Sequence, residues 1–168
     1  MNQNNNPLNV KWASPRDTSV LWRGSTGYDS RGHAIFLTVP SGIRAAIRSM
    51  QSKWNNNKRT IKSIIRDWAE KKDTIGSIPG NPQNDPAAYI HYVSDVTGIY
   101  DQLILPDPVK NPIPWLKIIH AMARYEMGED CSWIAIFIGM AQWMDDFGKP
   151  LPDETVAHPL VTLRQTGG

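Results

Sequence analysis

Residues 114–128 read PWLKIIHAMARYEMG, and this stretch decides the fold that the sequence predicts. Four of its residues recur at i, i+4, i+7 and i+11, so they share one face of a helix: Trp115, Ile119, Met122 and Glu126. Gly128 suits the stop of that helix. An apolar face of this kind has to be buried against other elements, so we expect a packed, mainly helical domain.

Glu126 is unusual because it continues an apolar stripe instead of lying on the opposite, polar face. Desolvation by apolar neighbours and the negative end of the helix dipole would both raise its pKa. A carboxylic acid that stays protonated near neutral pH is what glycoside cleavage requires, so Glu126 is the candidate catalytic residue. The alternative is a chance register, with Glu126 forming a salt bridge at a frayed helix end.

Start and stop signals predict four further helices around this one. Asp85 before Pro86 is an N-cap followed by an N1 proline, and Gly98 ends that segment. The last helix, roughly 131–146, is apolar nearly all round, so we expect it to be central or covered by a partner. The remaining start signals are Pro40-Ser41, Thr60 and, for the Glu126 helix, Asn111-Pro112.

One small β-hairpin is predicted before the helices. Residues 20–22 and 33–39 are strand candidates, and 29–32 read as the turn between them. The predicted fold class is therefore mainly α (α+β), with about five helices and one N-terminal hairpin.

The chain has 168 residues, which suits a single domain with a sizeable core. We expect a mobile Asn-rich tail over residues 1–6, one mainly helical domain over 7–147 and an extended C-terminal arm over 148–168. The first residues have no basic and apolar run of the signal-peptide kind. The longest apolar run, 133–141, is too short to span a bilayer.

Charge is balanced overall but divided along the chain. Residues 1–72 contain 13 Lys/Arg and 4 Asp/Glu, a net of +9, whereas residues 73–168 contain 5 and 12, a net of −7. A basic half of this kind could bind nucleic acid or another polyanion. The simpler interpretation is that the two halves neutralise each other within the fold.

Metal and cofactor signatures are lacking in the sequence. Cys131 is the single cysteine, and the four histidines do not form a paired ligand motif. Neither a phosphate-binding glycine loop nor a Gly-x-Ser-x-Gly elbow is present, so we expect no metal and no cofactor.

Residues 22–29 read WRGSTGYD and form a second candidate region. Aromatic faces bind sugar rings, and carboxylates bind their hydroxyl groups, so Trp22, Tyr28 and Asp29 are candidate substrate-binding residues. Asp29 would also be the candidate second carboxylate. Ordinary turn chemistry and core packing explain the same residues equally well.

Read together, several short motifs resemble a family of phage and prophage virion structural proteins. They cover roughly residues 5–128 in the family's order: NNPLNVK at 5–11, WRG at 22–24, GHAIF at 32–36, GIRA at 42–45, IIRDWA at 64–69, NDPAAYI at 84–90 and RYEMG at 124–128. Leu8 stands where the family has glycine. His33 stands where it has an aromatic residue, so His33 is a candidate wall residue of a groove. The resemblance implies a virion location, or the host bacterial cytoplasm before assembly.

The end of the Glu126 helix also resembles the helix end that carries the catalytic glutamate of lytic transglycosylases. The order of hairpin and helix is opposite here, so this resemblance implies a permuted lysozyme-like domain. Its partners would be peptidoglycan glycan strands. Three functions stay open: a virion-associated peptidoglycan glycosidase or lytic transglycosylase, a non-enzymatic virion protein that binds other virion proteins or itself through 131–168, and a nucleic-acid-binding protein.

Overall fold

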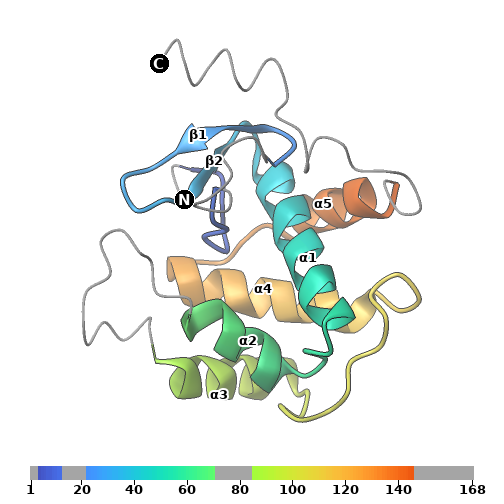
Figure 1. Ribbon diagram of the computed structural model, residues 1–168. Coiled ribbons are helices and arrows are strands. Elements are labelled where there is room, and N and C mark those ends of the chain that lie inside the picture. The colour runs from blue at the N-terminus through green and yellow to red at the C-terminus, as the bar shows by residue number, and fades with distance from the viewer. Residues whose placement is uncertain (1–3, 13–21, 71–84, 146–168) are drawn as a thin grey trace.

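The computed structural model describes residues 4–12, 22–70 and 85–145. The fold is mainly α with one small antiparallel hairpin, as predicted (Figure 1). In chain order the elements are β1 (Ser25–Tyr28), β2 (Ala34–Phe36), α1 (Val39–Asn55), α2 (Ile61–Glu70), α3 (Pro86–Thr97), α4 (Ile113–Met127) and α5 (Trp133–Asp145).

Capping residues set the helix ends where the sequence places them. Asp85 accepts hydrogen bonds from the backbone N–H groups of the first turn of α3, and the Thr60 hydroxyl accepts one from the backbone of α2. Gly98 and Gly128 adopt the left-handed conformation that ends α3 and α4. These four predictions are confirmed.

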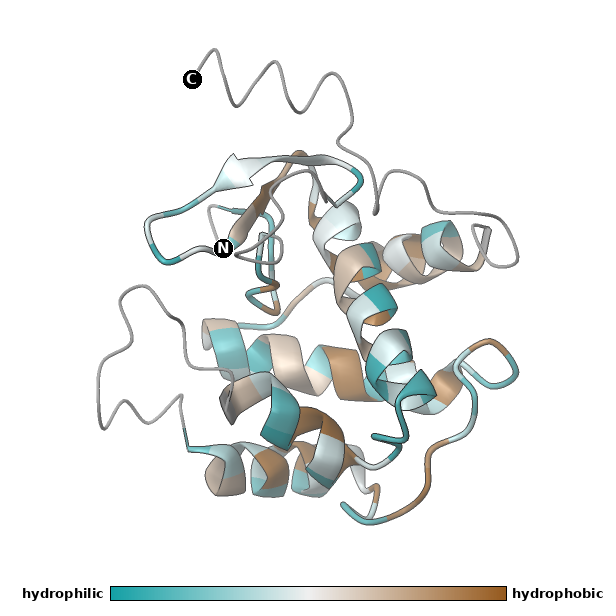
Figure 2. Ribbon diagram, viewed as in Figure 1, coloured by the Kyte–Doolittle hydropathy of each residue, from teal (hydrophilic) through white to brown (hydrophobic). Residues whose placement is uncertain are grey.

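Helix α4 lies in the middle of the molecule, with α3 on one side and α5 on the other (Figure 1). Its predicted stripe residues Trp115, Ile119 and Met122 are all buried. Brown, hydrophobic stretches of α4 and β2 mark the interior in Figure 2. The apolar stripe therefore packs as the periodicity predicts.

Helix α5 is only half covered. One side packs on α1, where Gly139 comes so close that a Cβ on it would lie 2.6 Å from Ile43 Cγ2. The other side is exposed, and Ile134 is 70% accessible. Of the two expected alternatives, the central position is not found, because α1 covers one face of α5 and the described part of the chain leaves the opposite face open. Coverage by a partner stays a prediction. Within the described residues, no helix combines the length and the apolar character needed to cross a bilayer.

The hairpin forms, but its first strand is not the predicted one. Strand β1 spans Ser25–Tyr28 and pairs with β2. Residues 20–21 lie outside the described part, and Trp22 lies in a turn, because its carbonyl accepts hydrogen bonds from both the N–H and the hydroxyl of Ser25. Gly24, at φ +77°, continues this turn into the strand. The predicted second strand is confirmed over its central residues only, because α1 begins at Val39.

The segment 4–12 runs beside the hairpin as an ordered extension. The Asn6 side chain is fully buried, donates to the carbonyls of Val10 and Ala34, and accepts from the Val10 N–H. Residues Lys11 and His33 form an isolated antiparallel bridge. The expected mobile tail is therefore wrong for residues 4–6, since side-chain amides replace the hydrophobic anchors that the sequence lacks there. Residues 1–3 and the expected arm at 148–168 lie outside the described residues.

Candidate functional site

Glu126 lies in the last turn of α4, at the end that faces the N-terminal segment (Figure 1). Its predecessors on the stripe are buried in the core, whereas Glu126 itself is half-buried. The fully buried ring of Tyr89 from α3 lies beside it and stacks on Tyr125 at 4.0 Å between ring centroids. The residue as a whole is partly exposed, while its carboxyl group is enclosed by protein.

The immediate hydrogen-bonding partners of Glu126 are neutral. The Asn9 side-chain amide donates to Glu126 Oε2 at 2.9 Å, across 117 residues of sequence. The Tyr89 hydroxyl, which donates to the Met122 carbonyl at 3.5 Å, is also a hydrogen-bonding neighbour of the same carboxyl. Neutral partners leave the carboxyl able to carry a proton, whereas a close salt bridge would hold it ionised.

Burial raises the pKa of Glu126 above its usual value. The hydrogen bonds from Asn9 and Tyr89 and the positive charges of Arg31 and Lys11 oppose this rise but do not cancel it. Desolvation, which the apolar stripe led us to expect, is therefore the dominant cause.

The residues Lys11, Asp29, Arg31 and His33, here called the hairpin cluster, lie on the bridge and turn beside β1 and β2. Asp29 Oδ2 is 3.3 Å from His33 Nδ1, and both Lys11 and Arg31 act electrostatically on Glu126. The two cations of the hairpin cluster are therefore close enough to Glu126 to affect its pKa.

The Asp29 carboxylate accepts hydrogen bonds within the hairpin turn. Burial by itself would raise the pKa of Asp29, but hydrogen bonds from the His33 N–H, the Asn4 amide and the Arg31 N–H lower it below its usual value. These bonds hold Asp29 ionised and fix the turn that presents Arg31. The geometry favours a positioning role for Asp29 over that of a second catalytic carboxylate.

The pKa values of His33 and Lys11 are both lower than usual. Burial is the largest cause of the lowered pKa of His33, followed by the charge of Lys11. Burial and the nearby Arg31 likewise lower the pKa of Lys11. His33 is also buried, and its Nδ1 lies against Asp29 inside the hairpin region, so the structure does not place it on the wall of an open groove.

The aromatic candidates border the same region. Trp22 donates its ring N–H to the Lys11 carbonyl at 2.7 Å and packs against the core. Tyr28 is 57% exposed at the end of β1 and contacts Trp12 at 5.5 Å between ring centroids. Trp22 is thus largely structural, while Tyr28 presents an open aromatic face next to the hairpin cluster.

Of the predicted site residues, Asp29 and His33 contact each other, Trp22 bonds to the Lys11 carbonyl, and Glu126 is reached from this region by the charges of Lys11 and Arg31. Residue-by-residue reasoning missed four neighbours of Glu126: Asn9, Lys11, Arg31 and Tyr89. Two of them, Asn9 and Lys11, lie within the opening motif at residues 5–11, which was the signal that could have identified them.

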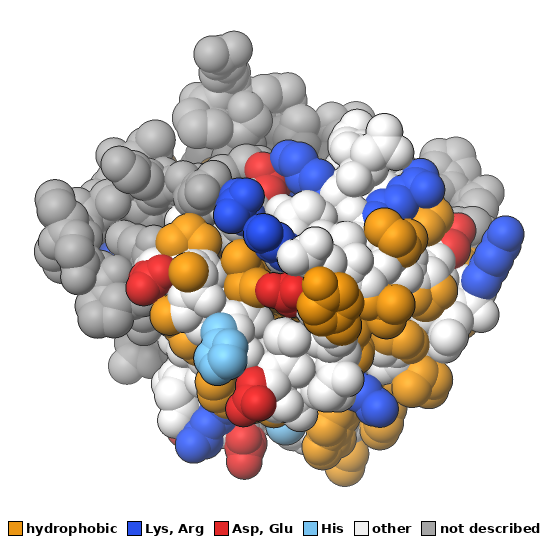
Figure 3. Space-filling model, turned by 90° about the horizontal axis from the view of Figure 1, so that it is seen from below, with side chains coloured by type: hydrophobic (Ala, Val, Ile, Leu, Met, Phe, Trp, Pro, Cys, Tyr) orange, Lys and Arg blue, Asp and Glu red, His pale blue; other side chains and the backbone are white. Residues whose placement is uncertain are grey.

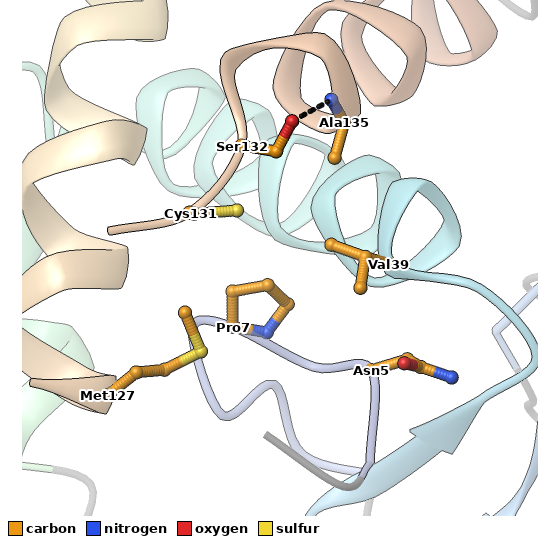
Figure 4. Close-up of a pocket in the computed structure, with 7 residues that line it drawn as sticks. All are labelled: Asn5, Pro7, Val39, Met127, Cys131, Ser132 and Ala135. Carbon is orange, nitrogen blue, oxygen red and sulfur yellow. Dashed lines mark hydrogen bonds between the residues drawn. The ribbon is translucent and has the colours of Figure 1, made fainter. Parts of the chain in front are cut away.

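A small, mainly apolar pocket lies next to this end of α4 (Figure 4). The N-terminal segment, α1, the end of α4 and the start of α5 all contribute to it: Asn5, Pro7, Val39, Met127, Cys131, Ser132 and Ala135. Glu126 does not line it, although the next residue does. The pocket therefore adjoins the candidate site without containing its acid.

The basic helices α1 and α2 and the loop between them use several of their cations internally. Asp67 accepts from Lys53 at 2.6 Å and from Lys58 at 2.7 Å, and the Arg59 guanidinium stacks on Trp54 at 4.1 Å. All these partners lie within residues 1–72, so the contacts occupy cations of the basic half without pairing it to the acidic half. In the part of the chain that the structure describes, no group of three or more His, Cys, Asp or Glu residues is arranged to hold a metal ion.

No known protein-family model matches the chain, and no curated protein is significantly similar to it.

The raised pKa of Glu126 predicts a pH-dependent cost to stability. A carboxyl whose pKa is higher in the folded protein stabilises the fold below its unfolded pKa, and this stabilisation is lost as pH rises through the folded pKa. The free energy of unfolding of Glu126→Gln, relative to that of wild type, should therefore be higher at about pH 8 than at about pH 4. Urea unfolding at both pH values measures this gain, and a difference that stays constant with pH would contradict it.

Proposed function

We propose that this protein is a virion-associated, lysozyme-like domain that cleaves peptidoglycan glycan strands by a lytic-transglycosylase type of reaction. The observation that carries the proposal is Glu126: a partly exposed residue at a helix end whose enclosed carboxyl has a raised pKa, neutral hydrogen-bonding partners and the two cations of the hairpin cluster in electrostatic range. A protonated acid in such surroundings is suited to general acid catalysis on a glycosidic bond.

In the proposed reaction Glu126 gives its proton to the glycosidic oxygen as the bond from that oxygen to the anomeric carbon breaks. The Glu126 carboxylate then accepts the proton of a hydroxyl on the same sugar, whose oxygen bonds to the anomeric carbon. The acid is restored, and no second carboxylate is needed. This route fits the commitment of Asp29 to the turn, because a two-carboxylate hydrolase would need a second free carboxylate.

The hairpin cluster supports the second half of this cycle. Once Glu126 has donated its proton, it is a negative charge in a desolvated place, which is unfavourable. Arg31 and Lys11 lower the pKa of Glu126, so they stabilise that transient carboxylate. A raised pKa that is moderated by nearby cations suits a group that must both give and retake a proton.

Incubation with purified, dye-labelled cell wall tests the proposal. We expect wild-type protein to release soluble dye and to leave cyclic, non-reducing sugar ends that borohydride does not label. Borohydride-reducible ends would instead indicate hydrolysis with water. Failure of the wild-type protein to release any dye would contradict the lytic function.

The exposed side of α5 favours a second candidate, a non-enzymatic role in virion assembly. It presents Trp133, Ile134, Phe137 and Ile138, all more than 40% accessible, and Trp133 stacks on His120 at 4.0 Å. Hydrophobic side chains are also exposed on the face seen from the α3 side (Figure 3). Apolar surface of this extent is typical of an interface with another virion protein or a second copy.

Light scattering on wild type and Ile134→Glu tests this assembly role. If α5 mediates self-association, wild type should have a mass above one chain, and the charge at position 134 should reduce it to a monomer. Lys117→Glu, a change at an exposed position of α4, is the control and should leave the mass unchanged. A wild-type monomer would contradict self-assembly.

Nucleic-acid binding through the basic half ranks third, because Lys53, Lys58 and Arg59 are engaged within the fold. Binding to phosphates would be strongest at low salt. We expect no retardation of duplex or single-stranded DNA at low salt. A shift that disappears as salt is raised would restore this function.

A further inference from the structure

Within the described residues, the Asn9 side chain reaches Glu126 from outside the helices and bonds to it directly. Its amide nitrogen lies 2.9 Å from Glu126 Oε2. An amide N–H can only donate, so Oε2 is kept as an acceptor. The Tyr89 hydroxyl is the other hydrogen-bonding neighbour of the carboxyl, so Asn9 and Tyr89 together hold its orientation.

The backbone that carries Asn9 is held in an uncommon conformation. Asn9 has φ +54°, in the left-handed region that costs most side chains energy, although Asn tolerates it better than most. The turn is closed by a hydrogen bond of 3.1 Å from the Asn9 N–H to the Asn6 carbonyl. Such a conformation persists only where the surroundings enforce it.

Contacts on both sides of Asn9 hold this turn in place. The preceding residue, Leu8, is fully buried, and its carbonyl accepts from the Trp68 ring N–H at 3.2 Å. On the other side, the buried Asn6 side chain binds both Val10 and the β2 residue Ala34. The turn is therefore fixed to α2 and to the hairpin at once, while its tip reaches α4.

From this geometry we propose that Asn9 is a positioning residue, which fixes the side-chain orientation of Glu126 and keeps its Oε2 as a hydrogen-bond acceptor. The inference rests on the proposed function for its catalytic meaning, but the hold of Asn9 on Glu126 is measurable without any substrate. A residue whose backbone is fixed by hydrogen bonds and packing can hold a reacting group in the orientation that catalysis needs.

Carboxyl carbon-13 NMR on the full-length protein tests the hold directly, with Glu126→Gln used to assign the resonance. Asn9→Gly keeps the left-handed backbone but removes the donor. The hydrogen bond from Asn9 lowers the pKa of Glu126, so its loss should raise that pKa further and increase the mobility of the side chain. Asn57→Gly is the matched control, since Asn57 has φ +66° after the end of α1 and is exposed.

Cell-wall cleavage supplies the second readout. Asn9→Gly should cleave roughly 10 to 100 times more slowly than wild type, because the acid is less well oriented. Activity that needs protonated Glu126 is lost as pH rises through its pKa, so this alkaline limit should move to higher pH in Asn9→Gly. A change that merely loosened the fold would lower the rate without moving the limit.

The outcomes separate the two proposals. A Glu126 pKa and mobility that stay as in wild type in Asn9→Gly would overturn the positioning role, as would equal changes in Asn57→Gly. If Asn9→Gly does not fold, Asn9→Asp keeps the size and turn preference of the residue but replaces the donor by a carboxylate, and it should raise the pKa of Glu126 through like-charge repulsion. If wild type cleaves no wall, the lytic function fails, while the NMR result still decides what Asn9 does to Glu126.

Discussion

Glu126→Gln should lower the rate of cell-wall cleavage by about 10² to 10⁴-fold, the range by which a general acid accelerates a reaction. Glutamine has nearly the same shape and can still accept from Asn9, but it has no proton to give to a glycosidic oxygen. The substitution also removes a carboxyl whose charged form is disfavoured by burial. The variant should therefore be inactive while being at least as stable as wild type near neutral pH.

Glu129→Gln is the matched control for this experiment. Glu129 follows the Gly128 cap and is exposed, so its replacement makes the same chemical change three residues away. We expect this variant to cleave cell wall at the wild-type rate. Equal clearing by Glu126→Gln and wild type would exclude Glu126 as the acid, and a loss shared by both variants would point to an effect of charge on wall binding.

Gly42→Ala should destabilise the protein, because α1 packs tightly on the N-terminal segment at this position. A Cβ at residue 42 would lie 2.3 Å from the Asn5 carbonyl oxygen and 3.1 Å from Asn6 Cα, which are both backbone atoms. Overpacking of this kind costs up to about 3 kcal/mol. The higher helix propensity of alanine offsets about 1 kcal/mol of this loss in stability. The net loss should be about 2 kcal/mol, or a fall in Tm of roughly 4–8 °C.

Gly27→Ala provides the control for Gly42→Ala. Gly27 lies in β1, has no positive φ, and a Cβ there would meet nothing within 4 Å. We expect its Tm to stay close to that of wild type. Thermal unfolding of both variants measures the difference, and a Gly42→Ala protein as stable as wild type would show that segment 4–12 can move away from α1 at little cost.

The same variant connects stability to the proposed site. Asn5 and Asn6 precede the turn that carries Asn9, so displacing them from α1 should also disturb the contact to Glu126. We therefore expect Gly42→Ala to cleave cell wall more slowly than Gly27→Ala at a temperature where both are folded.

The parts of the fold that could be predicted are those encoded by neighbours in sequence. The stripe that ends in Glu126 and the stops at Gly98 and Gly128 depend on helix periodicity and on backbone conformations near one residue. Strand β1 was misplaced because three apolar residues at 20–22 gave a stronger local signal than STGY at 25–28. Small polar residues form a strand there because the neighbouring β2 supplies the hydrogen bonds.

That Glu126 ends a buried helical stripe follows from spacing along one helix and could be read from neighbouring residues. Its surroundings depend on how distant segments pack. Asn9, Arg31 and Tyr89 come from three other parts of the chain, and the order of the N-terminal segment depends on amide hydrogen bonds to β2. The physical reason is that desolvation follows local apolar neighbours, whereas hydrogen bonds and charge interactions depend on distances that only the packed chain sets.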